Sequence, residues 1–280
     1  MYGHSIHGCS DFVKKDNPAY LEEVYKCARK EGQYEVLVSK LKGQAKHPKT
    51  LETVLEDYET YSDSSLFYEG FVVPERIKGT YDSSRSYCFS KSFRPLPDTK
   101  HGDFSAKWQI VYRDVPKWLN SGNRIELIEF MHDLYIVEGN KRVSVAKYKK
   151  IPEVGVSIKR LIPKLSNNRK DVDDYHRYMD FEKRTGLRWI YFSDADDFDK
   201  IENVIDFIYG DKRTKYSDFM TQIYIPFLHS YLRICHHQPR TEIGDVFMSF
   251  LDQVEDPKNV NSNTREKIIK KTLKKSQKII

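Results

Sequence analysis

The stretch YIVEGNKRVSVAKYKK, residues 135–150, decides the fold because it changes from a strand pattern to a helix pattern at a single glycine. Its first residues, Tyr-Ile-Val, favour a β-strand. The residues after Gly139 have the spacing of a helix. An acidic residue stands before the glycine, and an Asn-Lys-Arg triplet follows it. The sequence therefore predicts a strand that passes directly into a helix, with charged side chains gathered at the junction.

Further segments extend this unit on both sides. Two β-rich runs, separated by a short polar turn at His132–Asp133, predict a hairpin that ends at the glycine. A helix is expected before the hairpin, and strands are expected at both ends of the unit. This order describes an α+β domain over residues 71–163. Its elements are FVVPERIKG (71–79), FSAKWQIVYRDVPKWLN (104–120), RIELIEFM (124–131), LYIVEG (134–139), NKRVSVAKYKK (140–150) and VGVSIKRLI (154–162).

Helical patterns flank this domain on both sides. Residues 1–70 are predicted to form an N-terminal helical segment, in which a helix over residues 18–31 stops at Gly32. Residues 164–280 are predicted to form a helical C-terminal region with a basic tail. Pro226 should kink or divide a long helix in this region, because proline removes a backbone donor.

Charge and cysteine content indicate the setting of the chain. There are 47 lysines and arginines and 41 acidic residues, so the formal net charge is +6. The residues after position 257 supply much of this excess, which allows a polyanionic partner without requiring one. No CxxC pair and no membrane-length apolar run occurs, so we expect a soluble, cytoplasmic protein without a membrane partner. The cysteines are Cys9, Cys27, Cys88 and Cys235.

The junction after residue 138 has the features of an anion site. A helix N-terminus presents unpaired backbone N–H groups and a partial positive charge. Gly139 lets an anion approach the backbone, Asn140 is a suitable N-cap residue, and Lys141 and Arg142 add positive charge in the first turn. Two cations oppose the helix dipole there, so helix stability does not explain them. Glu138 could hold Mg²⁺ or accept a proton from a hydroxyl.

A plainer interpretation of the same residues stays open. Gly-Asn is also an ordinary turn, and Lys141 and Arg142 could lie on a solvated first turn with Glu138 as their ion-pair partner. One glycine-containing turn is a weaker signal than a full phosphate loop.

Three other patterns attract attention. Adjacent histidines, His236 and His237, point about 100° apart on a helix and are poorly placed to share a metal ion. The acidic run from Asp194 to Asp199 lacks the central glycine and final glutamate of a calcium loop, so we interpret it as helix capping. The lysine-rich tail, residues 259–280, could contact DNA or a membrane surface, or could form a solvated or partner-packed helix.

The run YIVEGNKRVSVAKY, set between RIELIEF and VGVSIKRLIP, resembles the ParB/sulfiredoxin-like superfamily. Its members carry a strand, a G-x-x-R turn, a helix with small residues and another strand, after an arginine-bearing loop and a helix. Here IKGTYDSSRSYCFS and FSAKWQIVYRDVPKWLNSGN occupy those upstream places. The resemblance covers a third of the chain and implies a small mixed sheet with helices.

This resemblance implies a nucleotide site. ParB-like proteins bind CTP, sulfiredoxins use ATP, and related free-serine kinases use ATP or ADP, each with the G-x-x-R turn near the phosphates. The implied cofactor is Mg²⁺ with ATP or CTP, and Glu138 is the implied metal ligand and catalytic carboxylate. The implied nucleotide-binding residues are Arg85, Gly139, Asn140, Lys141 and Arg142. Among these, Gly139 and Arg142 match the fixed glycine and arginine of the motif.

The sequence also departs from the better-known branches. Asn140 and Lys141 stand where a sulfiredoxin carries a cysteine just before its His-Arg pair, which argues against sulfiredoxin chemistry. No second phosphate motif followed by a helix-turn-helix is evident after Pro163, which argues against chromosome partition. Glu138 satisfies the acid of the serine-kinase branch, and Glu75 and Glu126 are candidates for its second carboxylate.

Three functional classes follow from these observations. The first is a nucleotide-dependent enzyme, a kinase-like phosphotransferase or an NTPase. The second is a nucleotide-gated DNA-binding or regulatory protein that uses the basic tail. The third is a ParB-like nuclease, which the lack of a set of three or four acids around the motif makes less favourable. Self-association of the chain is also open.

Overall fold

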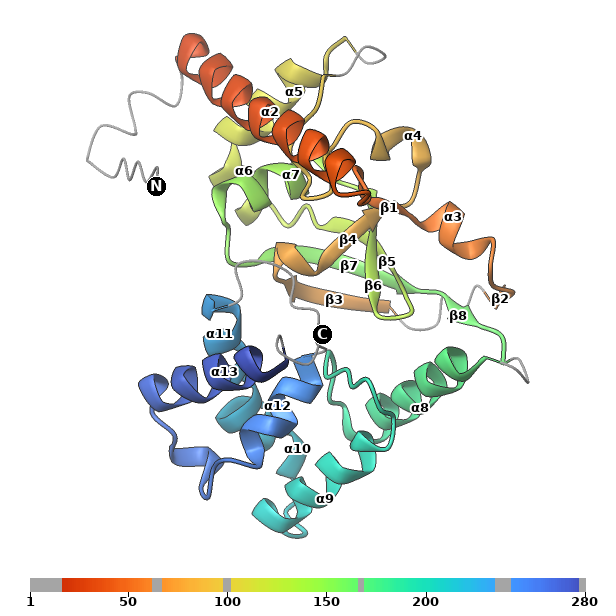
Figure 1. Ribbon diagram of the computed structural model, residues 1–280, viewed down its shortest axis with the longest axis vertical. Coiled ribbons are helices and arrows are strands. Elements are labelled where there is room, and N and C mark those ends of the chain that lie inside the picture. Colours follow the sequence, from red (N-terminus) through yellow and green to blue (C-terminus); the bar gives the residue numbers. More distant parts are fainter. Residues whose placement is uncertain (1–16, 62–66, 98–101, 166–168, 235–242, 277–280) are drawn as a thin grey trace. The chain divides into compact units, whose positions relative to one another are not determined.

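A six-stranded mixed sheet forms the centre of the first of two units into which the chain divides, Met1–Lys164 and Leu165–Ile280 (Figure 1). Each unit is described by itself. The computed structural model describes residues 17–61, 67–97, 102–165, 169–234 and 243–276.

The strand order of the sheet is β1-β4-β6-β5-β7-β3. Strands β1, β4 and β6 run parallel, β5 is antiparallel to β6 and parallel to β7, and β3 is an antiparallel edge strand. The α+β class with a mixed sheet is therefore confirmed. The strands are β1 (Lys49–Thr50), β3 (Phe67–Val72), β4 (Ile77–Thr80), β5 (Ile125–Phe130), β6 (Asp133–Glu138) and β7 (Val154–Arg160); β2 (Thr60–Tyr61) and β8 (Ile162–Pro163) form a separate pair.

Helices α2, α5 and α7 lie on one side of this sheet (Figure 1). The buried indole of Trp108 on α5 donates a hydrogen bond to Ser144 on α7, with Nε1 and Oγ 2.9 Å apart, and this bond fixes the two helices together. Residues 143–146 of α7 are fully covered. The helical segments of the unit are α2 (Pro18–Leu41), α3 (Leu51–Leu55), η1 (Pro74–Arg76), α4 (Ser83–Ser86), α5 (Phe104–Arg113), α6 (Val115–Asn120) and α7 (Asn140–Lys149).

Helix α2 does not stop at Gly32, so that prediction is wrong. The helix continues to Leu41, and Gly32 lies buried in its middle. A Cβ atom at this position would lie 2.7 Å from the carbonyl oxygen of Pro95, closer than atoms can pack. The glycine is required for this close approach, at a cost to helix propensity of about 1 kcal/mol. Because α2 packs against α5, the described part of residues 1–70 belongs to the same unit as the sheet.

The predicted hairpin forms, but its turn lies one residue earlier than expected. Strand β5 ends at Phe130 and β6 begins at Asp133, so Met131 and His132 form the two-residue turn. Both have positive φ angles, 48° and 70°, as tight hairpin turns that match the strand twist require. Met131 packs against a buried cluster that includes Phe130 and Tyr135, which helps to hold this conformation without glycine or asparagine.

One ion pair lies inside the sheet. Arg160 on β7 donates through Nε to the carboxylate of Glu129 on β5, and the two side chains are 8% and 1% exposed. The same carboxylate accepts a hydrogen bond from the backbone N–H of His132, with N and Oε1 2.9 Å apart. Glu129 therefore connects the hairpin turn to β7.

The second unit is helical, as predicted. Helix α9 begins at Asp197 with two aspartates in its first turn, where negative charge is favourable. The long helix predicted around Pro226 changes character before the proline, because a π-helical turn, residues 220–224, passes directly into the α-helix that carries Pro226. The segments are α8 (Lys170–Thr185), α9 (Asp197–Tyr209), α10 (Lys215–Phe219), η2 (Met220–Tyr224), α11 (Ile225–Ile234), α12 (Ile243–Leu251), η3 (Pro257–Asn259) and α13 (Ser262–Ser276).

Two further predictions concern metals and membranes. The histidine pair at residues 236–237 lies outside the described residues. In the described ranges, no three His, Cys, Asp or Glu side chains come together in a way that could hold a metal ion. None of the helices described there combines the length and the apolar character needed to cross a bilayer.

Candidate functional site

The helix N-terminus predicted from the sequence forms where β6 passes into α7. Gly139 is the N-cap residue, with a left-handed φ of 112° that favours glycine. The prediction that Asn140 caps the helix is wrong, because Asn140 is already its first residue. No side chain of a described residue caps this turn. The first backbone N–H groups of α7 therefore lack a side-chain acceptor, as an anion site requires.

Arg142 is anchored by the backbone of the loop before β5. Its Nη1 donates to the carbonyl oxygens of Asn123 and Arg124, at 2.7 and 3.3 Å. Within the part of the chain that the structure describes, Arg142 forms no ion pair with a carboxylate. Burial lowers the pKa of Arg142, and the negative charges of Glu138 and Glu126 partly oppose this shift. The guanidinium is thus held in place while its charge is left uncompensated by a direct partner.

A cavity of about 590 Å³ lies beside this guanidinium. Its lining is mostly polar and contains both signs of charge. Trp118 forms one wall, and its ring is fixed because Nε1 donates to the carbonyl oxygen of Val111 at 3.0 Å. The lining residues are Glu69, Trp118, Gly122, Asn123, Arg124, Glu126, Arg142 and Ser157.

The strand register brings three carboxylates into one row across the sheet. Glu138 on β6 lies opposite Glu126 on β5, which lies opposite Ser157 on β7, which in turn lies opposite Glu69 on β3. Directly opposed residues share a face of a sheet, so these four side chains lie on the same face. Arg124 pairs with Glu69 at 3.6 Å at the end of the row. The other two glutamates are exposed and have no ion-pair partner among the described residues.

Lys141 lies on a different side of the helix from Arg142. Its Nζ lies 4.8 Å from the centre of the Phe104 ring, and it does not line the cavity. Burial and the positive charges of Arg85 and Lys107 lower the pKa of Lys141. Three cations, Arg85, Lys107 and Lys141, are therefore close enough to repel one another. The nearby acidic residue Asp103 already pairs with Lys107 at 2.5 Å. An anion bound there would offset this repulsion.

The structure therefore brings the predicted residues together in two groups. Arg142 belongs to the cavity, and Arg85 and Lys141 belong to the cationic group beside Phe104. Gly139 lies between them, and a Cβ atom added at this position would be 3.3 Å from Nη2 of Arg142. The Oδ1 atom of Asn140 is buried and has no hydrogen-bond partner in the described part of the chain.

The two carboxylates considered as partners of Glu138, those of Glu126 and Glu75, lie in different places. Glu126 is its direct cross-strand neighbour. The negative charge of Glu75 instead raises the pKa of Lys147, which lies near the other end of α7. Burial and, to a smaller extent, the positive charge of Lys78 lower the pKa of Lys147 to about 7, although the negative charge of Glu75 partly opposes this shift. Lys147 donates to the carbonyl oxygen of Ile77 at 2.7 Å, so its amino group is engaged within the fold.

Sequence reasoning missed Trp118, Arg124 and Ser157 as parts of the site. No signal in the sequence distinguishes them, because they lie on three separate elements that only the strand register and the loop before β5 bring together. Comparisons of the chain with protein-family models, with curated proteins and with solved structures gave no match.

Proposed function

We propose that this protein binds a nucleotide at the N-terminus of α7 and acts as a ParB/sulfiredoxin-like, ATP- or CTP-dependent phosphotransferase or NTPase. The observation that carries this proposal is the placement of Arg142. Its guanidinium is fixed by two backbone carbonyls, carries no carboxylate partner among the described residues, and borders a cavity large enough for a small ligand. Such a group is suited to a phosphate.

The charges around the helix support a division of roles. The phosphates would bind to the free N–H groups of the first turn of α7 and to Arg142. Lys141 and Arg85 would neutralise phosphate charge on the other side of the same turn. The fixed ring of Trp118 offers an apolar wall against which a base could stack.

In this proposal, Glu138 acts on the attacking group. In the proposed step, a hydroxyl or water attacks the terminal phosphorus, a new P–O bond forms, and the bond to the leaving phosphate oxygen breaks. The carboxylate of Glu138 accepts the proton that the attacking oxygen loses. Positioning and charge compensation supply most of the acceleration in reactions of this kind.

Mg²⁺ fits the residues at this site. Mg²⁺ is commonly bound by one or two carboxylates together with substrate phosphates, and Glu138 and Glu126 are opposed and exposed. When bound, the ion would neutralise charge on the phosphate oxygens. A ParB-like nuclease is less well supported, since no metal-holding group of three side chains occurs in the described ranges. A nucleotide-gated DNA-binding protein is the second candidate, favoured by the lysines of α13.

Thermal unfolding with ATP, CTP or GTP, each with and without Mg²⁺, tests the proposal. A ligand that binds only the folded state stabilises it by about 2.7 kcal/mol at about 100 times its Kd. We expect a clear rise in melting temperature with ATP or CTP and a larger rise with Mg²⁺. Equal melting temperatures under all these conditions would refute nucleotide binding.

The substitution Glu138→Gln tests the role of the carboxylate. Glutamine keeps the shape of the side chain but cannot accept the proton, so we expect at least a tenfold loss of phosphate release. The rise in melting temperature that the nucleotide causes without Mg²⁺ should remain. Glu153→Gln is the matched control, since Glu153 is exposed in the loop before β7 and lies outside the site. If Glu138→Gln releases phosphate at the rate of the unmodified protein, the proposed proton acceptor is wrong.

A further inference from the structure

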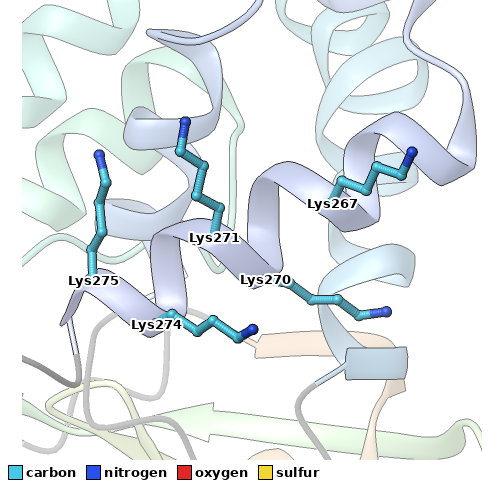
Figure 2. A pocket seen from close by; sticks show the side chains of 5 residues that line it. All are labelled: Lys267, Lys270, Lys271, Lys274 and Lys275. Atoms are coloured by element: carbon cyan, nitrogen blue, oxygen red, sulfur yellow. The ribbon is translucent and has the colours of Figure 1, made fainter.

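Helix α13 carries a face made only of lysines, shown in Figure 2. Five lysines recur at intervals of three or four residues, and all five are exposed. They line a shallow hollow of about 390 Å³, and no other residue of the described ranges contributes to its lining. Because residues at this spacing lie on one side of a helix, their charges form a single strip. The lysines of this strip, the lysine face, are Lys267, Lys270, Lys271, Lys274 and Lys275.

The opposite side of α13 is occupied within the second unit. Ile269 is fully buried and Thr272 is 7% exposed, and the helix packs against α11 and α12. Gln253, which follows α12, donates to Thr272 with Nε2 and Oγ1 3.4 Å apart. This packing fixes the rotation of α13, so the lysine face is directed away from the core of its unit.

The acidic residue of the helix does not neutralise this strip. Glu266 pairs with Arg233 of α11 at 3.1 Å and lies 3.9 Å from Lys270. The other four lysines form no ion pair with any described residue. Four ammonium groups held close together without carboxylate partners repel one another. A polyanion bound along the strip would remove this repulsion.

We propose that the lysine face binds the phosphate backbone of duplex nucleic acid without regard to sequence. From Lys267 to Lys275 the helix rises by about 12 Å, at about 1.5 Å per residue. Phosphates of one strand follow one another at about 3.4 Å along the duplex axis, so this length spans three or four of them. Lysine acts as a point charge on phosphates and supplies no fixed pattern for reading bases.

Two other polyanionic surfaces fit the geometry less well. An amphipathic helix binds a membrane by inserting its apolar side, but Ile269 is already buried in the unit. Single strands are bound through aromatic side chains on which bases stack, and the lysine face contains none. This inference does not depend on the nucleotide site of the first unit, since the two surfaces share no residue.

Fluorescence anisotropy with a short labelled DNA duplex of mixed sequence tests this proposal on the full chain. The logarithm of the binding constant should fall with the logarithm of salt concentration with a slope of about −2.7 to −3.6, from about −0.9 for each of three or four phosphates contacted. The triple variant Lys267→Gln, Lys271→Gln, Lys274→Gln should bind at least tenfold more weakly at low salt, and its slope should be shallower by about 2 to 3.

The control variant is Lys30→Gln, Lys170→Gln, Lys183→Gln. These three exposed lysines lie outside α13, and the variant removes the same total charge. Its affinity and slope should stay within twofold of the unmodified protein. Equal losses in both variants would show a dependence on net charge alone and would overturn the proposal. Failure of the unmodified protein to bind the duplex would overturn it too, as would binding to phosphatidylserine vesicles in preference to the duplex.

Discussion

Replacing Arg142 by alanine is expected to abolish the nucleotide-dependent rise in melting temperature. The guanidinium is the cation that borders the cavity from the first turn of α7, and it is already oriented by two backbone carbonyls. A charge-assisted, oriented contact with phosphate is among the stronger interactions in proteins. Its loss should weaken nucleotide binding about a hundredfold or more. Isothermal titration calorimetry with the nucleotide that stabilises the unmodified protein measures this change.

The same substitution also removes two internal hydrogen bonds, so its effects on binding and on folding must be separated. The exposed loop can rehydrate, and the expected loss of unfolding free energy is about 1–3 kcal/mol. Arg142→Lys keeps the charge without the planar donor group and should give an intermediate affinity. Arg113→Ala removes an arginine on α5 that is paired with Asp114, outside the cavity lining, and should leave binding unchanged. Full affinity in a folded Arg142→Ala variant would contradict the site.

Replacing Glu129 by alanine is expected to lower the unfolding free energy of the first unit by about 3–5 kcal/mol. Its partner Arg160 would stay buried without a compensating charge, and the backbone N–H of His132 would lose its acceptor. Removing one member of a buried pair costs far more than removing an exposed pair. Chemical denaturation followed by far-ultraviolet circular dichroism measures the loss.

Two variants make this prediction specific. Asp103→Ala breaks the exposed pair with Lys107, in which both side chains are more than half exposed, and should cost less than about 1 kcal/mol. The double variant Glu129→Leu, Arg160→Met replaces the buried charges with apolar side chains of similar size and should recover much of the lost stability. A loss in Glu129→Ala no greater than in Asp103→Ala would show that the buried pair has little energetic role.

The fold class follows from local patterns because each central element has a clear period. The alternation in residues 125–130 and the helical spacing after Gly139 place β5, β6 and α7 correctly. Gly32 misled the prediction because its role depends on Pro95, which is distant in sequence. A glycine that ends a helix and one that admits a neighbouring chain look the same in a sequence.

The turn position could not be predicted for a related reason. A two-residue hairpin turn with positive φ is usually signalled by asparagine or glycine. Met131 and His132 give no such signal, and Met131 is held by contacts with a buried cluster. The polar character of His132–Asp133 therefore suggested a turn one residue too late.

The candidate site could be predicted in part. The helix N-terminus and the residues on it follow from the strand-to-helix junction. The position of Glu126 opposite Glu138 depends on the β5–β6 register, which includes an irregularity after Glu126. A shift of one residue would turn Glu126 to the other face of the sheet. The sequence therefore suggests Glu126 and Glu75 equally, and only the strand pairing distinguishes them.

The anchoring of Arg142 by carbonyl groups has an evolutionary consequence. Every amino acid supplies the same carbonyl, so positions 123 and 124 can diverge freely without releasing the guanidinium. Only the glycine and the arginine three residues later are constrained by this arrangement. Descendants of a common ancestor would therefore share the spacing of these two residues long after the loop that holds the arginine had lost all similarity.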